Sequence, residues 1–295
     1  MKALVFQYDV RVVDKPHPPV PKEHLLIKVH AVALDGIENA IYGSLLWVEP
    51  GRILGVEGYG RVELLGVDSD TIFSGKLVAG YPKTIRGVPG VEYDGWAAEY
   101  TSQPSSGVGL LPDDVDDVIA AATAGSASIA LYVAEKSVGK NLLVVGSGYT
   151  GVLAAYFARH AVSIGLVGNV RKGLRGIVRG FVNSIYNYSK LKELKGEWDI
   201  VFLSSLDARA RMYIRGLYGT TSVIVHPWLE LLSTSIRGLT HIEVASWTRI
   251  GEAYQELRRV DEDLRKELTA VVDSFEAALP VPKAKVIVRL VEEKG

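Results

Sequence analysis

One stretch of this chain decides its fold: Leu142-Leu143-Val144-Val145-Gly146-Ser147-Gly148-Tyr149-Thr150-Gly151. The four aliphatic residues predict a short buried strand, and Val152 to His160 predict a helix. Between them the three glycines have the spacing G-x-G-x-x-G. In this spacing the first glycine permits a tight turn, the second lets a ligand approach the backbone, and the third lets helix and strand pack closely. The stretch therefore predicts a strand–turn–helix unit whose helix N-terminus can bind phosphate groups.

The residues that follow repeat the alternation of strand and helix. Aliphatic strands are predicted at Ser163–Val167, Asp199–Leu203 and Thr221–Val225. Continuous aliphatic strands separated by helices indicate a parallel sheet covered on both faces, the doubly wound Rossmann arrangement. In this setting the glycine motif predicts a dinucleotide site formed by residues Gly146, Ser147, Gly148, Tyr149, Thr150 and Gly151. The alternative is a glycine turn in an α/β sheet that has lost its ligand.

The end of the second strand predicts which dinucleotide binds. NAD sites usually carry Asp or Glu here to hold the ribose 2′-hydroxyl. This chain has Gly168-Asn169-Val170-Arg171-Lys172, with no carboxylate. Asn169 is small enough to leave room for a 2′-phosphate, and Arg171 and Lys172 are suited to pair with that phosphate. The sequence therefore favours NADP(H). The alternative is that both cations belong to a solvated helix start.

The first hundred residues predict a β-rich domain. The segment 25–32 is aliphatic and follows a Pro-rich stretch, and glycines then recur at short intervals. An Ala-rich helix is predicted from Val118 to Glu135, with a domain boundary close to its start. Near the other end, Glu252 to Ala278 predict one long charged helix with Glu262 and Lys266 spaced as an i,i+4 pair, and Lys285–Leu290 predict a strand.

Composition excludes several classes of function. The chain has 295 residues, 48% hydrophobic residues and a net charge of -1, which favours two ordinary domains and gives no electrostatic case for nucleic acid or an anionic membrane. The absence of Cys excludes disulfides, thiolate metal sites and Cys nucleophiles. Scarce Asn, Gln and Met are typical of thermophiles, although chance is an alternative. No stretch predicts a membrane span or a signal peptide, so the expected location is the cytoplasm.

Several motifs resemble the medium-chain dehydrogenase/reductase family, to which zinc alcohol dehydrogenases and quinone reductases belong. They include Met1-Lys2-Ala3, residues 55–60, which resemble G-H-E-x-x-G, and residues 94–100, which resemble the family's G-x-x-A-E-Y strand. The resemblance implies an α/β fold with a GroES-like β-rich catalytic domain, residues 1–115 with 272–295, and a Rossmann domain with its doubly wound parallel sheet, residues 116–271. Asn169 with its basic neighbours, and residues 188–192, are also similar to archaeal glucose dehydrogenases.

The zinc positions of that family are depleted here. The first ligand position matches Asp35, the usual His is Val56, Glu57 is retained, and Ala124-Gly125-Ser126 offers no good final ligand. Zinc prefers N or S donors and needs three protein ligands, so we expect no catalytic metal ion. The structural zinc lobe is also missing, and Ile37 stands at the position of the hydroxyl residue that relays the substrate proton.

The remaining candidates for chemistry are few. Tyr42 is the first candidate proton donor, although a packing role is the alternative. Asp35 and Glu57 are a possible carboxylate pair in which one member acts as an acid. The alternative for that pair is a structural hydrogen bond or a salt bridge to an arginine such as Arg52 or Arg61. His226 lies at a strand end that the family places near the nicotinamide, whereas His30 is expected to be an ordinary strand residue.

Together these observations predict a zinc-independent, NADP(H)-dependent oxidoreductase acting on a carbonyl, enone or quinone-like small molecule between its domains. A metal-dependent alcohol or sugar dehydrogenase using Asp35 and Glu57 is one alternative. A non-catalytic nucleotide sensor or scaffold is another. By analogy with the family, we expect a homodimer joined through the sheet edge at 242–245.

Overall fold

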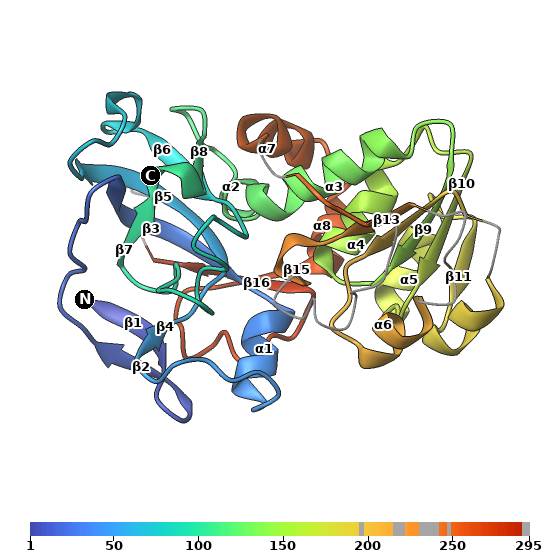
Figure 1. Cartoon of the computed structure of the whole chain (residues 1–295), viewed down its shortest axis with the longest axis horizontal. Helices are drawn as coiled ribbons and strands as arrows, with labels where there is room; N and C mark the ends of the chain where they lie inside the picture. Colours follow the sequence, from blue (N-terminus) through green and yellow to red (C-terminus); the bar gives the residue numbers. More distant parts are fainter. Residues whose placement is uncertain (195–197, 215–221, 230–241, 247–248, 291–295) are drawn as a thin grey trace. The chain divides into compact units, whose positions relative to one another are not determined.

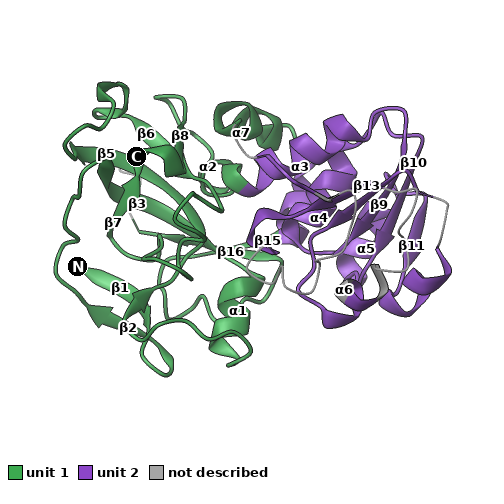
Figure 2. Cartoon of the chain, viewed as in Figure 1, with its two compact units in different colours: residues 1–125, 248–260, 269–295 green, residues 126–247, 261–268 purple. Residues whose placement is uncertain are grey.

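The computed structural model describes residues 1–194, 198–214, 222–229, 242–246 and 249–290. The chain divides into two compact units (Figure 2). Unit 1 contains residues 1–125, 248–260 and 269–295, and unit 2 contains residues 126–247 and 261–268. Unit 1 is therefore assembled from segments that are far apart in the sequence.

Unit 2 is built on a six-stranded parallel sheet (Figure 1). Its strands are β9 (Asn141–Val145), β10 (Ser163–Val167), β11 (Ser184–Tyr186), β12 (Ile200–Leu203), β13 (Ser222–Val225) and β14 (Ile242–Val244). Their order is β11-β10-β9-β12-β13-β14, and each pair of neighbours is parallel. This is the 3-2-1-4-5-6 order of the Rossmann fold, which confirms the predicted sheet.

Helices precede, connect and follow these strands. They are α3 (Ala124–Lys136), α4 (Tyr149–Phe157), α5 (Lys172–Val178), the 3-10 helix η3 (Tyr188–Glu193), α6 (Ala208–Ile214) and α8 (Glu262–Leu268). A hydrophobic cluster under the sheet includes Leu143, Val201, Val223 and the indole of Trp198. The four central strands β10, β9, β12 and β13 are almost entirely buried, and their aliphatic sequences have the continuous character expected of a covered parallel sheet. Thr221, which we expected to begin β13, lies outside the described residues.

Unit 1 contains two β-sheets. The smaller has the order β2-β1-β4, formed by β1 (Lys2–Phe6), β2 (Val10–Asp14) and β4 (Arg52–Ile53). The larger has the order β15-β16-β3-β5-β6-β8, and β7 also pairs with β3. Its strands are β3 (His24–Leu34), β5 (Glu57–Leu65), β6 (Leu77–Gly80), β7 (Tyr100–Pro104), β8 (Val108–Leu110), β15 (Thr269–Val272) and β16 (Lys285–Arg289). β16 lies antiparallel to β3, so the end of the described chain rejoins the N-terminal unit.

The helices of unit 1 are short. They are α1 (Gly36–Tyr42), α2 (Val118–Ala122), α7 (Ile250–Arg258) and the 3-10 helices η1 (Thr71–Phe73) and η2 (Ser105–Gly107). The boundary expected at residue 115 therefore differs from the one found after Gly125. The reason is that α2 packs on β3, β5 and β6, and α7 is held to unit 1 by a 2.8 Å hydrogen bond from Tyr254 to Asp116.

The long helix expected from Glu252 to Ala278 is wrong. α7 ends at Arg258, α8 occupies Glu262–Leu268, and the next residues form β15. The Asp261 carboxylate accepts a 3.0 Å hydrogen bond from the backbone N of Leu264, which starts a new helix. Residues 269–272 then pair with β16 in parallel. The predicted ion pair between Glu262 and Lys266 is confirmed at 2.7 Å.

The Ala-rich helix expected from Val118 to Glu135 is likewise two helices. It breaks at Thr123, whose hydroxyl donates a 2.7 Å hydrogen bond to the carbonyl of Ile119. A hydroxyl that bonds the preceding turn competes with the helix ladder, which accounts for the break.

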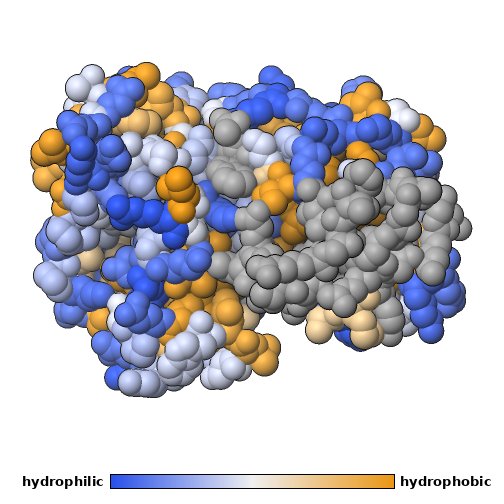
Figure 3. All heavy atoms as spheres, in the orientation of Figure 1, coloured by the Kyte–Doolittle hydropathy of each residue, from blue (hydrophilic) through white to orange (hydrophobic). Residues whose placement is uncertain are grey.

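Hydrophobic side chains reach the surface of unit 1 around α1 (Figure 3). There Tyr42 is 49% exposed, and in the loop that follows Leu45 is 87% and Trp47 65% exposed. In the described part of the chain, none of the helices has the length and apolar character needed to cross a membrane.

Candidate functional site

Two of the three motif glycines are required by packing within unit 2. Gly146 has a φ of +132°, a conformation that side chains rarely adopt, and a Cβ there would lie 2.6 Å from the Ser204 hydroxyl at the end of β12. A Cβ on Gly151 would collide with the carbonyl of Gly146 and approach the same hydroxyl at 2.7 Å. Gly146 and Gly151 therefore let the loop and the start of α4 pack tightly against β12.

Gly148 is different because none of the residues that the structure describes requires a glycine there. It is the N-cap of α4 with φ of -77° and ψ of -176°, an extended backbone that any residue adopts. A Cβ at this position would meet no atom within 4 Å. No side chain caps the helix at this end. The open space and the uncapped helix N-terminus fit a pyrophosphate in contact with the backbone.

The remaining motif residues position this loop. A Cβ on Gly168, directly after β10, would lie 2.5 Å from the Ser147 hydroxyl, so the loop rests against the end of the second strand. Tyr149 and Thr150 are 5% and 7% exposed and form the buried first turn of α4. The loop between β9 and α4 is therefore held in place by contacts with the ends of both neighbouring strands, β10 and β12.

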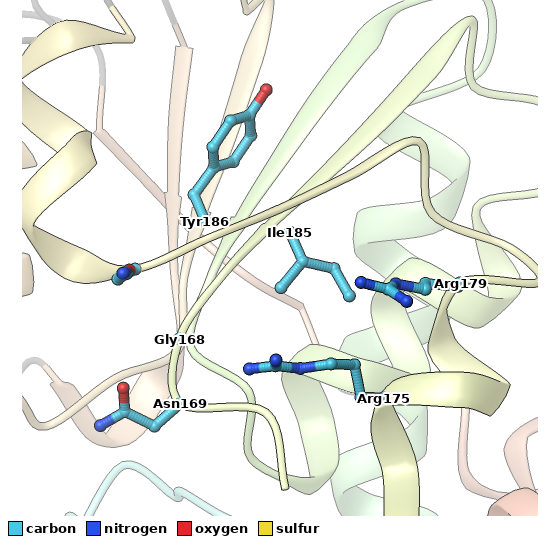
Figure 4. Close-up of a pocket in the computed structure, with 7 residues that line it drawn as sticks. Gly168, Asn169, Arg175, Arg179, Ile185 and Tyr186 are labelled. Carbon is cyan, nitrogen blue, oxygen red and sulfur yellow. The ribbon is translucent and has the colours of Figure 1, made fainter. Parts of the chain in front are cut away.

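A pocket of about 320 Å³ lies at the carboxyl ends of β10 and β11 (Figure 4). Its lining residues are Gly168, Asn169, Arg175, Arg179, Ile185, Tyr186 and Asn187. Figure 4 shows the guanidinium group of Arg179 beside Ile185 and that of Arg175 extending below it toward Gly168 and Asn169. Within the described residues neither guanidinium has an ion pair, so this end of the sheet presents two cations to a ligand.

The basic residues chosen from the sequence lie beside this pocket. Asn169 lines it, whereas Arg171 is the exposed N-cap of α5 and Lys172 is the exposed first residue of that helix. Sequence reasoning missed Arg175 and Arg179. Their spacing of four residues on a helix was an available signal, because residues four apart share a face.

In unit 1 the structure brings Asp35 and Glu57 together around a third residue, Lys285. The Lys285 Nζ donates to Asp35 Oδ2 at 2.9 Å and also to Glu57 Oε1. The side chains of Lys285 and Glu57 are 1% exposed and that of Asp35 is 17% exposed. Neither Arg52 nor Arg61 is the partner, since Arg52 binds Glu49 at 2.6 Å and Arg61 binds the Gly75 carbonyl at 2.7 Å. Lys285 is the functional residue that sequence reasoning missed in this unit.

A third carboxylate, Glu38, lies beside this group. Asp35 caps α1 by accepting a 2.9 Å hydrogen bond from the N of Ile37, and Glu38 closes the capping box by accepting one from the N of Asp35 at 2.7 Å. Its other oxygen accepts from the N of Val56 at 3.1 Å. Burial, and secondly the charge of Asp35, raise the pKa of Glu38 to about 7.

Lys285 carries the positive charge of the cluster. Burial by itself would lower the pKa of its ammonium, but Asp35 and Glu57 outweigh burial and raise that pKa above its usual value. Val56 is a buried aliphatic residue, and the Cα of Gly125 lies so close to Glu57 that a Cβ there would be 3.0 Å from Oε2.

Tyr42 is not brought to the two carboxylates. It is the last residue of α1, whereas Asp35 caps the opposite end, and seven helical residues rise by roughly 10 Å. His226 follows β13 and is buried, with its ring stacked on Phe202 at 6.4 Å and 4.6 Å from that of Trp228. His30 is a strand residue of β3 beside Tyr59, as expected.

The fold and these motifs agree with comparisons to known proteins. Residues 21–113 match the model of the alcohol dehydrogenase GroES-like domain. This part of the chain is therefore similar to the GroES-like domain of alcohol dehydrogenases. Related sequences include L-threonine 3-dehydrogenases. That of Anaeromyxobacter sp. (strain K) is 32% identical over 175 residues, which cover 50% of this chain and 49% of the relative. That of Xanthomonas euvesicatoria pv. vesicatoria (strain 85-10) is 30% identical over 185 residues, which cover 54% of each. The chain thus spans about half the length of the curated relatives it matches.

Solved structures of dehydrogenases have a similar fold. Glucose dehydrogenase of Haloferax mediterranei, in complex with NADP, Zn and gluconolactone, has a TM-score of 0.72 at 13% identity and covers 99% of this chain and 100% of its own. Galactitol-1-phosphate dehydrogenase of Escherichia coli has a TM-score of 0.69 at 18% identity, with 98% and 100% covered. At this identity the likeness shows the architecture, and the chemistry must come from the residues of the site.

Proposed function

We propose that this chain is an NADP(H)-dependent oxidoreductase that acts on a carbonyl, enone or quinone-like small molecule without zinc. The observation that carries the proposal is Gly148, whose missing Cβ leaves open space at an uncapped helix N-terminus. A pyrophosphate in that space would accept hydrogen bonds from the first turn of α4 and lie at the positive end of the helix dipole. When bound, the nicotinamide supplies the hydride.

The preference for the phosphorylated cofactor rests on the residues at the ends of β10 and β11. None of the described residues that line the pocket there has a carboxylate to accept a hydrogen bond from a ribose 2′-hydroxyl. Arg175 and Arg179 line it and would form charge-assisted, bidentate hydrogen bonds with a 2′-phosphate. Arg171 and Lys172 lie at the start of the same helix and would add a weaker attraction. Asn169 would leave space for the phosphate.

A catalytic zinc ion does not fit the residues of unit 1. Zinc takes three protein ligands and favours N and S donors. Asp35 and Glu57 are oxygen donors that already bind Lys285, Val56 has no donor atom, and Gly125 has no side chain. The proposed chemistry therefore has no step through a zinc ion.

The proton in this reaction would come from Tyr42 or from water. The exposed phenol of Tyr42 is open to solvent, whereas both carboxylates bind Lys285. We therefore assign Asp35 and Glu57 to holding α1 and β5 in position, and we retain Tyr42 as the proposed donor. Because Ile37 cannot carry a proton, the proposed route avoids the start of α1.

A second proposal is that the chain binds the nucleotide without catalysis. It is favoured because Asp35 and Glu57 both bind Lys285. Few of the described groups of unit 1 are then left to donate a proton. A homodimer joined through β14 also stays a prediction, although β14 does form one edge of the described sheet.

Nucleotide titration followed by nicotinamide fluorescence tests these proposals. Tighter binding of NADPH than of NADH, together with oxidation of NADPH by at least one carbonyl, enone or quinone, is expected. Binding without oxidation across a broad set of such acceptors would favour the non-catalytic alternative. Failure to bind either nucleotide would contradict both, and stoichiometric zinc in the purified protein would contradict the zinc-free reaction.

A further inference from the structure

Three separate parts of unit 1 meet at one buried point. Asp35 comes from the N-terminus of α1, Glu57 is the first residue of β5, and Lys285 is the first residue of β16. Lys285 is 250 residues from Asp35 and 228 residues from Glu57 along the chain. Long-range pairing of strands β3, β5 and β16 places their ends side by side, so the position of the ammonium is fixed by the sheet.

The two carboxylates need a cation at this point. A buried carboxylate without a positive partner is strongly destabilising, because its lost hydration is not replaced. Here one ammonium stands against two carboxylates, and the carboxyl group of Glu38 adjoins Asp35. The group formed by Asp35, Glu57 and Lys285 thus has a formal charge of -1 and holds its cation by direct hydrogen bonds from both sides.

Carboxylate oxygens converging from two elements are also the usual ligands of hard divalent cations. Among the described residues, however, no group of three or more His, Cys, Asp or Glu is arranged to hold a metal ion. The ammonium lies where a metal ion shared by Asp35 and Glu57 would have to lie. The cluster therefore has two carboxylates and a cation, but the cation is the side-chain ammonium of Lys285 and not a metal ion.

We propose that the Lys285 ammonium replaces a divalent metal ion in this cluster, and that removing it converts Asp35 and Glu57 into a divalent-cation site. The inference extends the zinc-free part of the proposed function, since a covalently attached cation keeps the site permanently closed to metal ions. It also identifies Lys285 as the residue that determines metal independence. Mn²⁺ is a suitable probe because it accepts oxygen ligands and its free form is measured directly by electron paramagnetic resonance.

The test compares the full-length wild-type protein with two variants, Lys285→Ala and Lys285→Ala combined with Glu57→Gln. Mn²⁺ binding is followed by electron paramagnetic resonance, and thermal unfolding is followed with and without Mn²⁺. We expect no Mn²⁺ bound to the wild type, one Mn²⁺ per chain and a rise in Tm on Lys285→Ala, and loss of that binding in the double variant. Mn²⁺ binding to the wild type with the same rise in Tm, or no binding to folded Lys285→Ala, would overturn the inference.

If Lys285→Ala does not fold, Lys285→Gln takes its place in the test. The glutamine side-chain amide can still donate a hydrogen bond to one carboxylate, but it has no positive charge. If neither variant folds alone, both are refolded from urea with excess Mn²⁺. Recovery of the native circular dichroism spectrum only with Mn²⁺ supports the inference, and no recovery contradicts it. NADPH titration of the wild-type protein is run in parallel. Because Mn²⁺ binding is measured without nucleotide, a wild type that fails to bind NADPH would refute the proposed function and leave the cation result standing.

Discussion

The ammonium of Lys285 donates a hydrogen bond to the carboxylate of Glu57, and both side chains are 1% exposed. The contact joins the first residue of β16 to the first residue of β5, two strands that both pair with β3. Buried ion pairs of this kind contribute little net stability compared with apolar packing, but breaking one of them by removing a single partner is costly. The pair therefore makes a sharp prediction about which substitutions unit 1 tolerates.

We expect Lys285→Met to destabilise the protein by about 3–5 kcal/mol, because it removes the ammonium that binds the buried carboxylate of Glu57 and the partly buried carboxylate of Asp35. Adding Glu57→Gln should recover a large part of this loss, since one of the uncompensated charges is removed. Urea unfolding of the three proteins measures the effect. Additive losses in the double variant would show that the two residues do not interact.

The glycines of the nucleotide loop should separate into two kinds. Gly148→Ala is expected to abolish NADPH binding while changing the free energy of unfolding by less than about 1 kcal/mol, because its Cβ would occupy only open space. Gly151→Ala is the matched control. Its Cβ would collide with Gly146, so it should lower stability by about 1–3 kcal/mol. Unchanged NADPH affinity in Gly148→Ala would show that no ligand uses the space beside it.

The two arginines of the pocket should determine cofactor choice. Arg175→Ala or Arg179→Ala is expected to weaken NADPH binding by about 10- to 100-fold, the range expected for a lost hydrogen bond to a charged group. NADH binding should stay nearly constant, because NADH has no 2′-phosphate. Fluorescence titration with both nucleotides measures the ratio. The control is Arg171→Ala with Lys172→Ala. If that control lowers the ratio more than the pocket variants, the residues chosen from the sequence are the phosphate ligands.

Glu38 should make stability depend on pH. Its pKa of about 7 lies above the value of an unfolded glutamate, so the folded state binds more protons between these two values. Its contribution to stability is therefore fully present below about pH 4.5 and is lost as pH rises through about 7. Each unit of pKa difference corresponds to ~1.4 kcal/mol, so about 2–3 kcal/mol should be lost between pH 5 and 8.

Glu38→Gln should remove most of that loss, because the glutamine amide does not titrate. Urea unfolding of both proteins across the same pH range provides the comparison. Wild-type and variant stabilities that change in parallel with pH would show that another group is responsible.

The local sequence pattern was sufficient to predict the Rossmann fold of unit 2. The aliphatic strands at 142–145 and 163–167 and the glycine motif between them are contiguous, and the structure has them as β9, α4 and β10. The fold class was therefore predictable from the sequence, as was the GroES-like match of residues 21–113. The Glu252–Ala278 helix failed because its composition is helical throughout, while tertiary pairing with β16 turns residues 269–272 into a strand.

The cluster in unit 1 was predictable only in part. Asp35 and Glu57 were recognised as a possible pair, but their cation lies more than two hundred residues away, and a lone lysine in a strand has no local signal. Lys285 could be found only when the pairing of β16 with β3 was known. Arg175 and Arg179 were not predicted because the cofactor pattern singles out the cations directly after β10, which are Arg171 and Lys172, and not those one helical turn further on.

The placement of β16 also has a consequence for synthesis on the ribosome. Unit 2 takes its six sheet strands from residues 141–244, so this sheet can pair while later residues are still being made. Asp35 and Glu57 emerge early, yet their ammonium partner is translated more than two hundred residues afterwards. Until then the larger sheet of unit 1 lacks β15 and β16, and the nascent chain carries two acidic groups in a half-formed interior. The protein therefore completes its N-terminal unit last.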